Sequence, residues 1–185
     1  LLLLILIPVF NFAQSRREAY ILAFKDVAIR EMKLYGIPAS ITLAQGILES
    51  GDGQSNLAKN ANNHFGIKCH EDWKGEKVYH DDDSKGECFR KYKHAEESYR
   101  DHSIFLSTRS RYASLFLLDK TDYEGWAKGL KKAGYATSPT YATSLIQLIE
   151  TNNLHAYDLE ALAESISPEE RILLAPNGAK YVVLN

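Results

Sequence analysis

The chain has 185 residues, a formal net charge of −2 at pH 7 and a hydrophobic fraction of 45%. Its length suits one globular domain with some additional sequence, since domains typically span about 100–150 residues. The charge leaves no basic footprint of the kind that nucleic-acid-binding domains carry, so we expect no nucleic-acid partner.

The first ten residues are almost wholly apolar. They are too few to span a bilayer comfortably, because a spanning helix needs about 20 residues. Ala13 then offers a small residue at a plausible cleavage point, which is typical of a signal peptide. We interpret residues 1–14 as a signal peptide remnant that lacks its charged start. The alternative is an uncleaved anchor, and either interpretation predicts an exported protein.

Two helices are predicted next. The first covers residues 15–35 and ends at Gly36, because apolar residues recur along it at helical spacing. The second covers residues 38–48, with Pro38 at its first position and a stop at Gly51. Its apolar residues lie on more than one face, which predicts a helix buried in the core.

Glu49 is the one carboxylate in the last turn of this second helix. Burial and the negative end of the helix dipole both disfavour its ionised form and predict a raised pKa. A general acid must be protonated at neutral pH, so this pattern fits one. The alternative is a glutamate that points into water. Gln45 shares a helix face with Glu49 and is placed to hydrogen-bond the acid or a sugar; the alternative is a surface pair.

A small β-lobe is expected in the middle of the chain. After a short helix over 54–59, residues 77–80 and 88–92 alternate like strands. Residues 81–86, which begin with three aspartates, form the tip of the predicted hairpin.

Cys69 and Cys88 bracket much of this lobe. In an exported protein their spacing suggests a disulfide, which would contribute roughly 3 kcal/mol on the chain-entropy model. The alternative is a zinc site that adds His70 and His80 as ligands. That spacing matches no common zinc finger, and we expect no metal ion.

The remaining predicted helices are short and regularly spaced. They cover residues 96–106, residues 111–117, a segment that Asp122 caps and that stops at Gly134, and a segment that starts at residue 138. There is no alternation of strands and helices and no repeat. The predicted fold class is therefore α+β and mostly α, a helical body with a small β-hairpin lobe.

Residues 159–185 form a different compositional zone. Turn signals around Pro168 and Pro176 indicate a linker, and residues 180–184 read as a strand. This strand resembles the opening strand of a LysM peptidoglycan-binding module.

Four motifs occur in order along the chain: AQGILESGDGQS, NNHFGIK, FRKY and AGYATSPTYA. Together they resemble the glucosaminidase domain of glycoside hydrolase family 73, over about residues 16–157. The resemblance implies a domain at 15–158 with a lysozyme-like fold that cleaves the β-1,4 bond between N-acetylglucosamine and N-acetylmuramic acid. It also implies that Glu49, in the E-S-G motif, is the catalytic acid. Family members often carry an aromatic residue where this chain has Asp52, which puts a local substrate contact in doubt.

A second carboxyl is expected, since glycoside hydrolysis normally uses two. The family carries an acidic residue in the lobe, and the resemblance points to Asp82 first, then Asp81, with Asp83 not distinguished by the alignment. The role would be to activate water or to stabilise the oxocarbenium charge. A solvated acidic turn is the alternative for this run. Participation of the substrate's own N-acetyl group is a further mechanistic alternative.

Tyr135 matches the tyrosine of a family motif near the catalytic cleft, which implies a hydrogen bond to the substrate; the alternative is a core tyrosine. Tyr141 and Phe65 also match motif positions, and we expect Phe65 to be structural or to line the cleft. His64 is the one histidine that we expect behind the site.

Three functions remain open from the sequence: an exported endo-β-N-acetylglucosaminidase, a lytic transglycosylase, and a catalytically inactive wall-binding module. The first is favoured. We expect peptidoglycan glycan strands as partner, no cofactor, no membrane after signal removal, a monomer, and a location in the periplasm or cell envelope.

Overall fold

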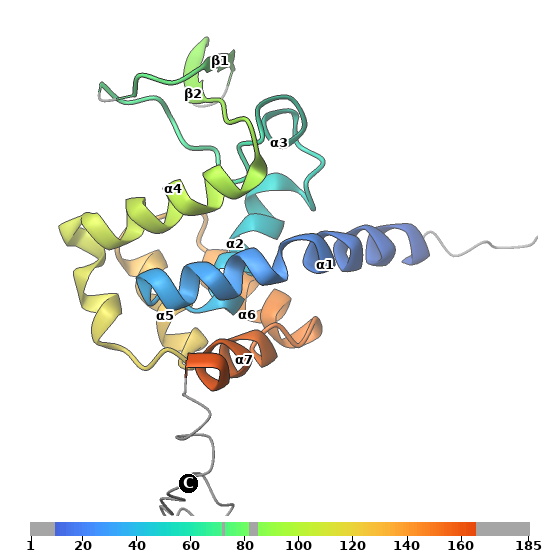
Figure 1. Ribbon diagram of the computed structural model, residues 1–185, viewed down its shortest axis with the longest axis vertical. Helices are drawn as coiled ribbons and strands as arrows, with labels where there is room; N and C mark the ends of the chain where they lie inside the picture. The colour runs from blue at the N-terminus through green and yellow to red at the C-terminus, as the bar shows by residue number, and fades with distance from the viewer. Residues whose placement is uncertain (1–9, 72, 82–84, 166–185) are drawn as a thin grey trace, which may run out of the picture.

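The computed structural model describes residues 10–71, 73–81 and 85–165, which form a helical body with a two-stranded lobe at one end (Figure 1). Its elements are α1 (Phe10–Tyr35), α2 (Ala39–Ser50), α3 (Asn56–Ala61), β1 (Lys77–His80), β2 (Glu87–Arg90), α4 (Ala95–Thr108), the 3₁₀ helix η1 (Ser110–Leu117), α5 (Tyr123–Lys132), α6 (Tyr141–Thr151) and α7 (Ala156–Ser165). The predicted class, α+β and mostly α, is confirmed.

Helix α2 lies at the centre of the helical body. Ten of its twelve residues are buried, and it packs against α1, α5, α6 and α7. Gly46 permits this packing, because a Cβ at this position would lie 2.7 Å from Tyr20 Oη and 2.9 Å from Tyr99 Oη. The prediction of a buried helix is confirmed, and this rigid core element carries Glu49.

The ends of α2 lie close to the predicted ones. Pro38 is the N-cap residue rather than the first helical residue, so the helix begins one position later than predicted. At the other end Gly51 adopts a left-handed conformation with φ 57° and donates its N–H to the carbonyl of Ile47. Glycine accepts this conformation without a steric cost, so it ends the helix directly after the turn that holds Glu49.

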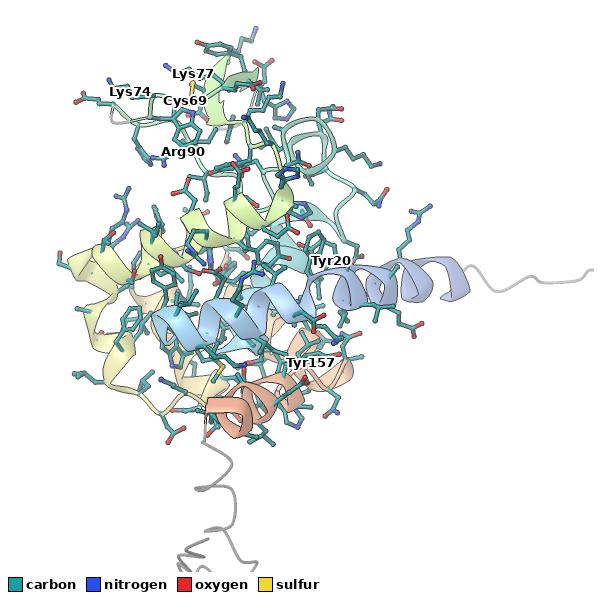
Figure 2. The ribbon with its side chains drawn as sticks, in the orientation of Figure 1. Tyr20, Cys69, Lys74, Lys77, Arg90 and Tyr157 are labelled. Atoms are coloured by element: carbon teal, nitrogen blue, oxygen red, sulfur yellow. A yellow bond between two sulfur atoms is a disulfide. The ribbon has the colours of Figure 1, made fainter. Side chains whose placement is uncertain are left out.

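The lobe consists of an antiparallel pair, with β1 and β2 in register so that Tyr79 lies opposite Cys88. The predicted disulfide between Cys69 and Cys88 is present, and Figure 2 labels Cys69 within the lobe. Disulfide sulfurs are not thiolates, so the alternative zinc set loses two of its four ligands. Among the described residues there is no cluster of three or more His, Cys, Asp or Glu side chains that could hold a metal ion.

Helix α7 has no counterpart among the predicted helices, and the predicted domain boundary at 158/159 falls inside it. Asp158 is completely buried; its carboxylate accepts the Ser40 N–H at 2.8 Å and the Ser40 hydroxyl at 2.6 Å. Burial raises the pKa of Asp158 to about 6, against the effect of these hydrogen bonds. The body thus extends through Ser165, and the rest of the predicted tail, including the LysM-like strand, lies outside the described residues.

Helix α1 begins at Phe10, five residues before its predicted start, and runs continuously across the predicted cleavage point. Residues 1–9 of the predicted signal peptide remnant lie outside the described part of the chain. None of the helices in the described ranges combines the length and apolar character that a membrane span requires.

Candidate active site

Glu49 lines a cleft of about 410 Å³. The cleft lies between the end of α2, helix α4 with the segment after it, the segment that enters the lobe, and the segment after α5. Its lining residues are Glu49, Phe65, Gly66, Ile67, Lys68, His70, His102, Phe105, Arg109, Arg111, Tyr135 and Ala136.

A chain of two hydrogen bonds holds the Glu49 carboxyl. Gln45 Nε2 donates to Tyr141 Oη at 2.9 Å, and Tyr141 Oη donates to Glu49 Oε1 at 3.1 Å. Gln45 lies on the predicted face of α2, but its link to Glu49 is indirect. Gln45 has no exposed surface in this structure, and its bond to Tyr141 connects it to the carboxyl; its contact with a sugar stays a prediction.

The electrostatics of Glu49 follow from its position at the wall of the cleft. Its side chain is exposed to the cleft, but the surrounding protein displaces much of the water, and this burial raises the pKa of Glu49 above its ordinary value. The hydrogen bond from Tyr141 acts in the opposite direction. Burial and, second, the charge of Glu49 raise the pKa of Tyr141, so the phenol stays neutral and remains a donor.

Aromatic rings form one wall of the cleft. Phe65 stacks on His102 with centroids 4.1 Å apart, and Tyr135 stacks on Tyr141 at 5.6 Å. Burial lowers the pKa of His102 to about 3, so this ring is neutral at neutral pH. Phe65 and Tyr135 line the cleft directly, whereas Tyr141 lies behind it in contact with Glu49. The structure therefore brings these three predicted positions together around the carboxyl.

The predicted second carboxylates do not line the cleft in the described chain. Asp81 is exposed on the hairpin, where its Oδ1 accepts the Gly86 N–H at 2.7 Å and closes the turn. Asp82 and Asp83 lie outside the described residues. Among the described residues that line the cleft, Glu49 is the only carboxylate.

Two further predicted positions have structural partners. Asp52 forms a bidentate ion pair with Arg17 of α1, with N–O distances of 3.0 and 3.2 Å, so the departure from the family's aromatic residue has a local explanation. His64 Nδ1 is hydrogen-bonded to Tyr20 Oη at 2.9 Å. Burial lowers the pKa of His64 to about 4, and His64 lies behind the cleft rather than in its lining, as expected.

Sequence reasoning did not place five polar side chains in the cleft, namely Lys68, His70, His102, Arg109 and Arg111. Both arginines follow α4: Arg109 lies outside every predicted element, and Arg111 begins the short helix predicted over 111–117. The two arginines are close in sequence to the aromatic residues Phe105 and Tyr112. This grouping of charged and aromatic residues was the signal in the sequence that could have indicated a binding surface.

Comparisons with known proteins agree with this geometry. The family described as mannosyl-glycoprotein endo-beta-N-acetylglucosaminidase matches residues 25–154. The peptidoglycan hydrolase FlgJ of Vibrio parahaemolyticus is 35% identical over 142 residues, which cover 71% of this chain and 46% of that protein. The exo-glucosaminidase LytG of Bacillus subtilis is 35% identical over 137 residues, covering 67% of this chain and 47% of that protein. The chain thus spans about half the length of the curated relatives it matches.

Among solved structures, a peptidoglycan hydrolase from Sphingomonas sp. A1 superposes with a TM-score of 0.65 and 30% identity, covering 77% of this chain and 94% of that one. The expected lysozyme-like fold is thereby confirmed. The family match over residues 25–154, most of the chain, shows that the chain belongs to the glucosaminidase family of glycoside hydrolases.

Proposed function

We propose that this protein is an exported peptidoglycan hydrolase, an endo-β-N-acetylglucosaminidase that cleaves the β-1,4 bond between N-acetylglucosamine and N-acetylmuramic acid. The observation that carries the proposal is Glu49, whose carboxyl lines the cleft with a pKa raised by burial. A raised pKa keeps a larger fraction of the carboxyl protonated near neutral pH, which is the form that can donate to a leaving glycosidic oxygen.

Tyr141 and Gln45 position this acid. The Tyr141 hydroxyl donates to one carboxyl oxygen of Glu49 and leaves the other free to carry the proton. Since Gln45 donates to the Tyr141 oxygen, the phenolic hydrogen is directed at Glu49 rather than at Gln45. In this proposal the pair orients the acid, while the ionised carboxylate formed after donation is stabilised by the same hydroxyl.

Tyr135 and Phe65 supply the walls against which sugar rings pack. Tyr135 is half-buried, and burial, as the largest cause, raises its pKa well above the ordinary value. We propose that its neutral phenol donates a hydrogen bond to the substrate near the anomeric carbon. Phe65 is held by its stack on His102 and borders the same space.

The second catalytic role has two candidates. One is Asp82 on the hairpin, acting as a general base on water or as a stabiliser of the oxocarbenium charge. The other is the substrate's own N-acetyl group, which requires no second carboxylate. Conversion of Asp82 to Asn decides between them: a loss of about 10²-fold or more in kcat supports Asp82, and an unchanged kcat supports the N-acetyl group.

The proposal places the protein at the bacterial wall. Peptidoglycan glycan strands are its partner, and its location is the periplasm or cell envelope, where the disulfide between Cys69 and Cys88 is stable. Relatives named as peptidoglycan hydrolases and as an autolysin support this location. We propose a monomer.

The test is release of soluble muropeptides from purified sacculi, with the new ends identified by mass. We expect wild type to release fragments with reducing N-acetylglucosamine ends, Glu49→Gln to release none, and Glu160→Gln, an exposed change on α7, to match wild type. Anhydro ends would instead identify a lytic transglycosylase. Binding to sacculi without release by any variant would identify a wall-binding module and refute the proposal.

A further inference from the structure

Among the described residues, the lining of the cleft carries more positive than negative charge, although the protein as a whole does not. The chain carries a net charge of −2, yet Lys68, Arg109 and Arg111 line the cleft against the single described carboxylate, Glu49. A concave site lined by one sign of charge concentrates the opposite charge from solution. The expected ligand of this cleft is therefore an anion.

Arg109 and Arg111 carry the charge that is open to a ligand. Lys68 is paired with Glu87 at 2.9 Å, which offsets most of its charge. Elsewhere in the molecule, Arg90 is paired with Asp101 at 3.0 Å. Among the residues that the structure describes, no carboxylate forms an ion pair with Arg109 or Arg111.

Aromatic rings support both guanidinium groups. The Arg109 guanidinium carbon lies 4.2 Å from the centre of the Phe105 ring, and that of Arg111 lies 4.9 Å from the Tyr112 ring. Tyr112 is completely buried, so its ring is a fixed support. A guanidinium over a ring keeps its N–H groups available at its edge, and these groups match the two oxygens of a carboxylate.

We propose that Arg109 and Arg111 form a subsite for a carboxylate of the glycan strand. The inference rests on the proposed function. N-acetylglucosamine is neutral, whereas a muramic acid residue carries a lactyl carboxyl, free in peptide-free strands and joined to an acidic stem peptide in intact wall. A carboxylate held by the two arginines distinguishes the muramic acid side of the scissile bond from the N-acetylglucosamine side. The subsite therefore fixes the register of the strand over Glu49.

Binding rather than turnover is the appropriate readout. The Glu49→Gln protein serves as parent so that the ligand is not cleaved, and Arg109→Gln/Arg111→Gln is added to it. A matched control adds Arg16→Gln/Lys132→Gln, which removes the same charge from exposed positions outside the cleft. Three ligands are titrated by calorimetry: peptide-free glycan oligosaccharides, the same oligosaccharides with their carboxyls converted to amides, and peptide-bearing oligosaccharides.

We expect the arginine variant to bind acidic strands about 10-fold or more weakly than its parent, since hydrogen bonds between charged groups are stronger than those between neutral groups. The amidated strands should bind parent and arginine variant equally, and the control should match the parent throughout. A loss confined to peptide-free strands assigns the lactyl carboxylate, and a loss confined to peptide-bearing strands assigns the stem peptide.

Equal losses on acidic and amidated strands would overturn the inference, because the arginines would then act without a carboxylate. Equal affinities of parent and variant for all three ligands would overturn it as well. Absence of muropeptide release by wild type refutes the proposed function alone, since the binding differences are measured without turnover.

Discussion

The bond between Tyr141 and Glu49 offers the sharpest test of how the site is built. Tyr141→Phe removes one hydroxyl and leaves the ring, which stacks on Tyr135, in place. Two groups lose a partner: Glu49 loses a donor at 3.1 Å, and Gln45 loses the acceptor for its Nε2 at 2.9 Å. The first loss concerns catalysis and the second concerns stability, so one substitution yields two separate measurements.

The stability cost comes from Gln45, which is completely buried. A buried donor left without a partner costs about 1–3 kcal/mol. For a protein of this size each kcal/mol lowers Tm by about 2–4 °C, so we expect a decrease of roughly 2–12 °C. Gln45→Met removes the donor at similar volume. The double variant Gln45→Met/Tyr141→Phe leaves no unpaired amide donor, and we expect it to cost less than the sum of the two single variants.

The catalytic effect concerns the pKa of Glu49, which the Tyr141 hydroxyl lowers and burial raises. Without the hydroxyl the pKa rises further, so the enzyme keeps its acid protonated to higher pH. The alkaline limb of the profile of kcat/KM against pH should therefore move to higher pH, measured by reducing-end release from sacculi. An alkaline limb that stays in place or moves to lower pH would refute the assignment of Glu49 as the acid that Tyr141 contacts.

Three further changes test the site and its support. Glu49→Gln should raise Tm at pH 7, because burial raises the pKa of Glu49 and its ionised form costs stability above that pKa; in calorimetric scans the gain should vanish towards pH 4. Gly46→Ala should cost about 1–3 kcal/mol in urea denaturation, since its Cβ meets the hydroxyls of Tyr20 and Tyr99; an unchanged midpoint would contradict this packing. His102→Phe should reduce acid lability. The folded protein keeps His102 neutral down to a pKa of about 3, so below pH 6.5 wild type loses about 1.4 kcal/mol per pH unit from this residue. Equal urea midpoint changes between pH 7 and pH 5 in both proteins would exclude this contribution.

The sequence was most informative where the determining interactions are local. Gly51 ends α2 through its own backbone conformation, and Asp122 begins α5 by accepting the Gly125 N–H three residues later. Both signals act within one helical turn, so they can be read without knowledge of the fold. The disulfide between Cys69 and Cys88 was predictable for a related reason, since these are the chain's two cysteines.

Contacts between distant segments could not be read in this way. Tyr141 and Glu49 are 92 residues apart, and the family resemblance identified both positions without indicating their contact. Helix α7 was missed because its buried face includes Asp158, a residue that local patterns assign to the surface. Its carboxylate is accepted in the core because Ser40, 118 residues away, donates two hydrogen bonds to it.

The acid and the arginines share one cleft but need opposite electrostatic conditions. A cation close to Glu49 would lower its pKa and leave less of the carboxyl protonated, and so able to donate, at neutral pH. Burial raises the pKa of Glu49 and the Tyr141 hydroxyl lowers it. The charges of Arg109 and Arg111 are not among the causes of this shift. We therefore expect Arg109→Gln/Arg111→Gln to leave the alkaline limb of the pH profile unchanged while it raises KM for acidic strands. A variant whose alkaline limb moves to higher pH would show that the arginines act on the acid itself, and the subsite would then have to be reassigned from substrate recognition to the tuning of Glu49.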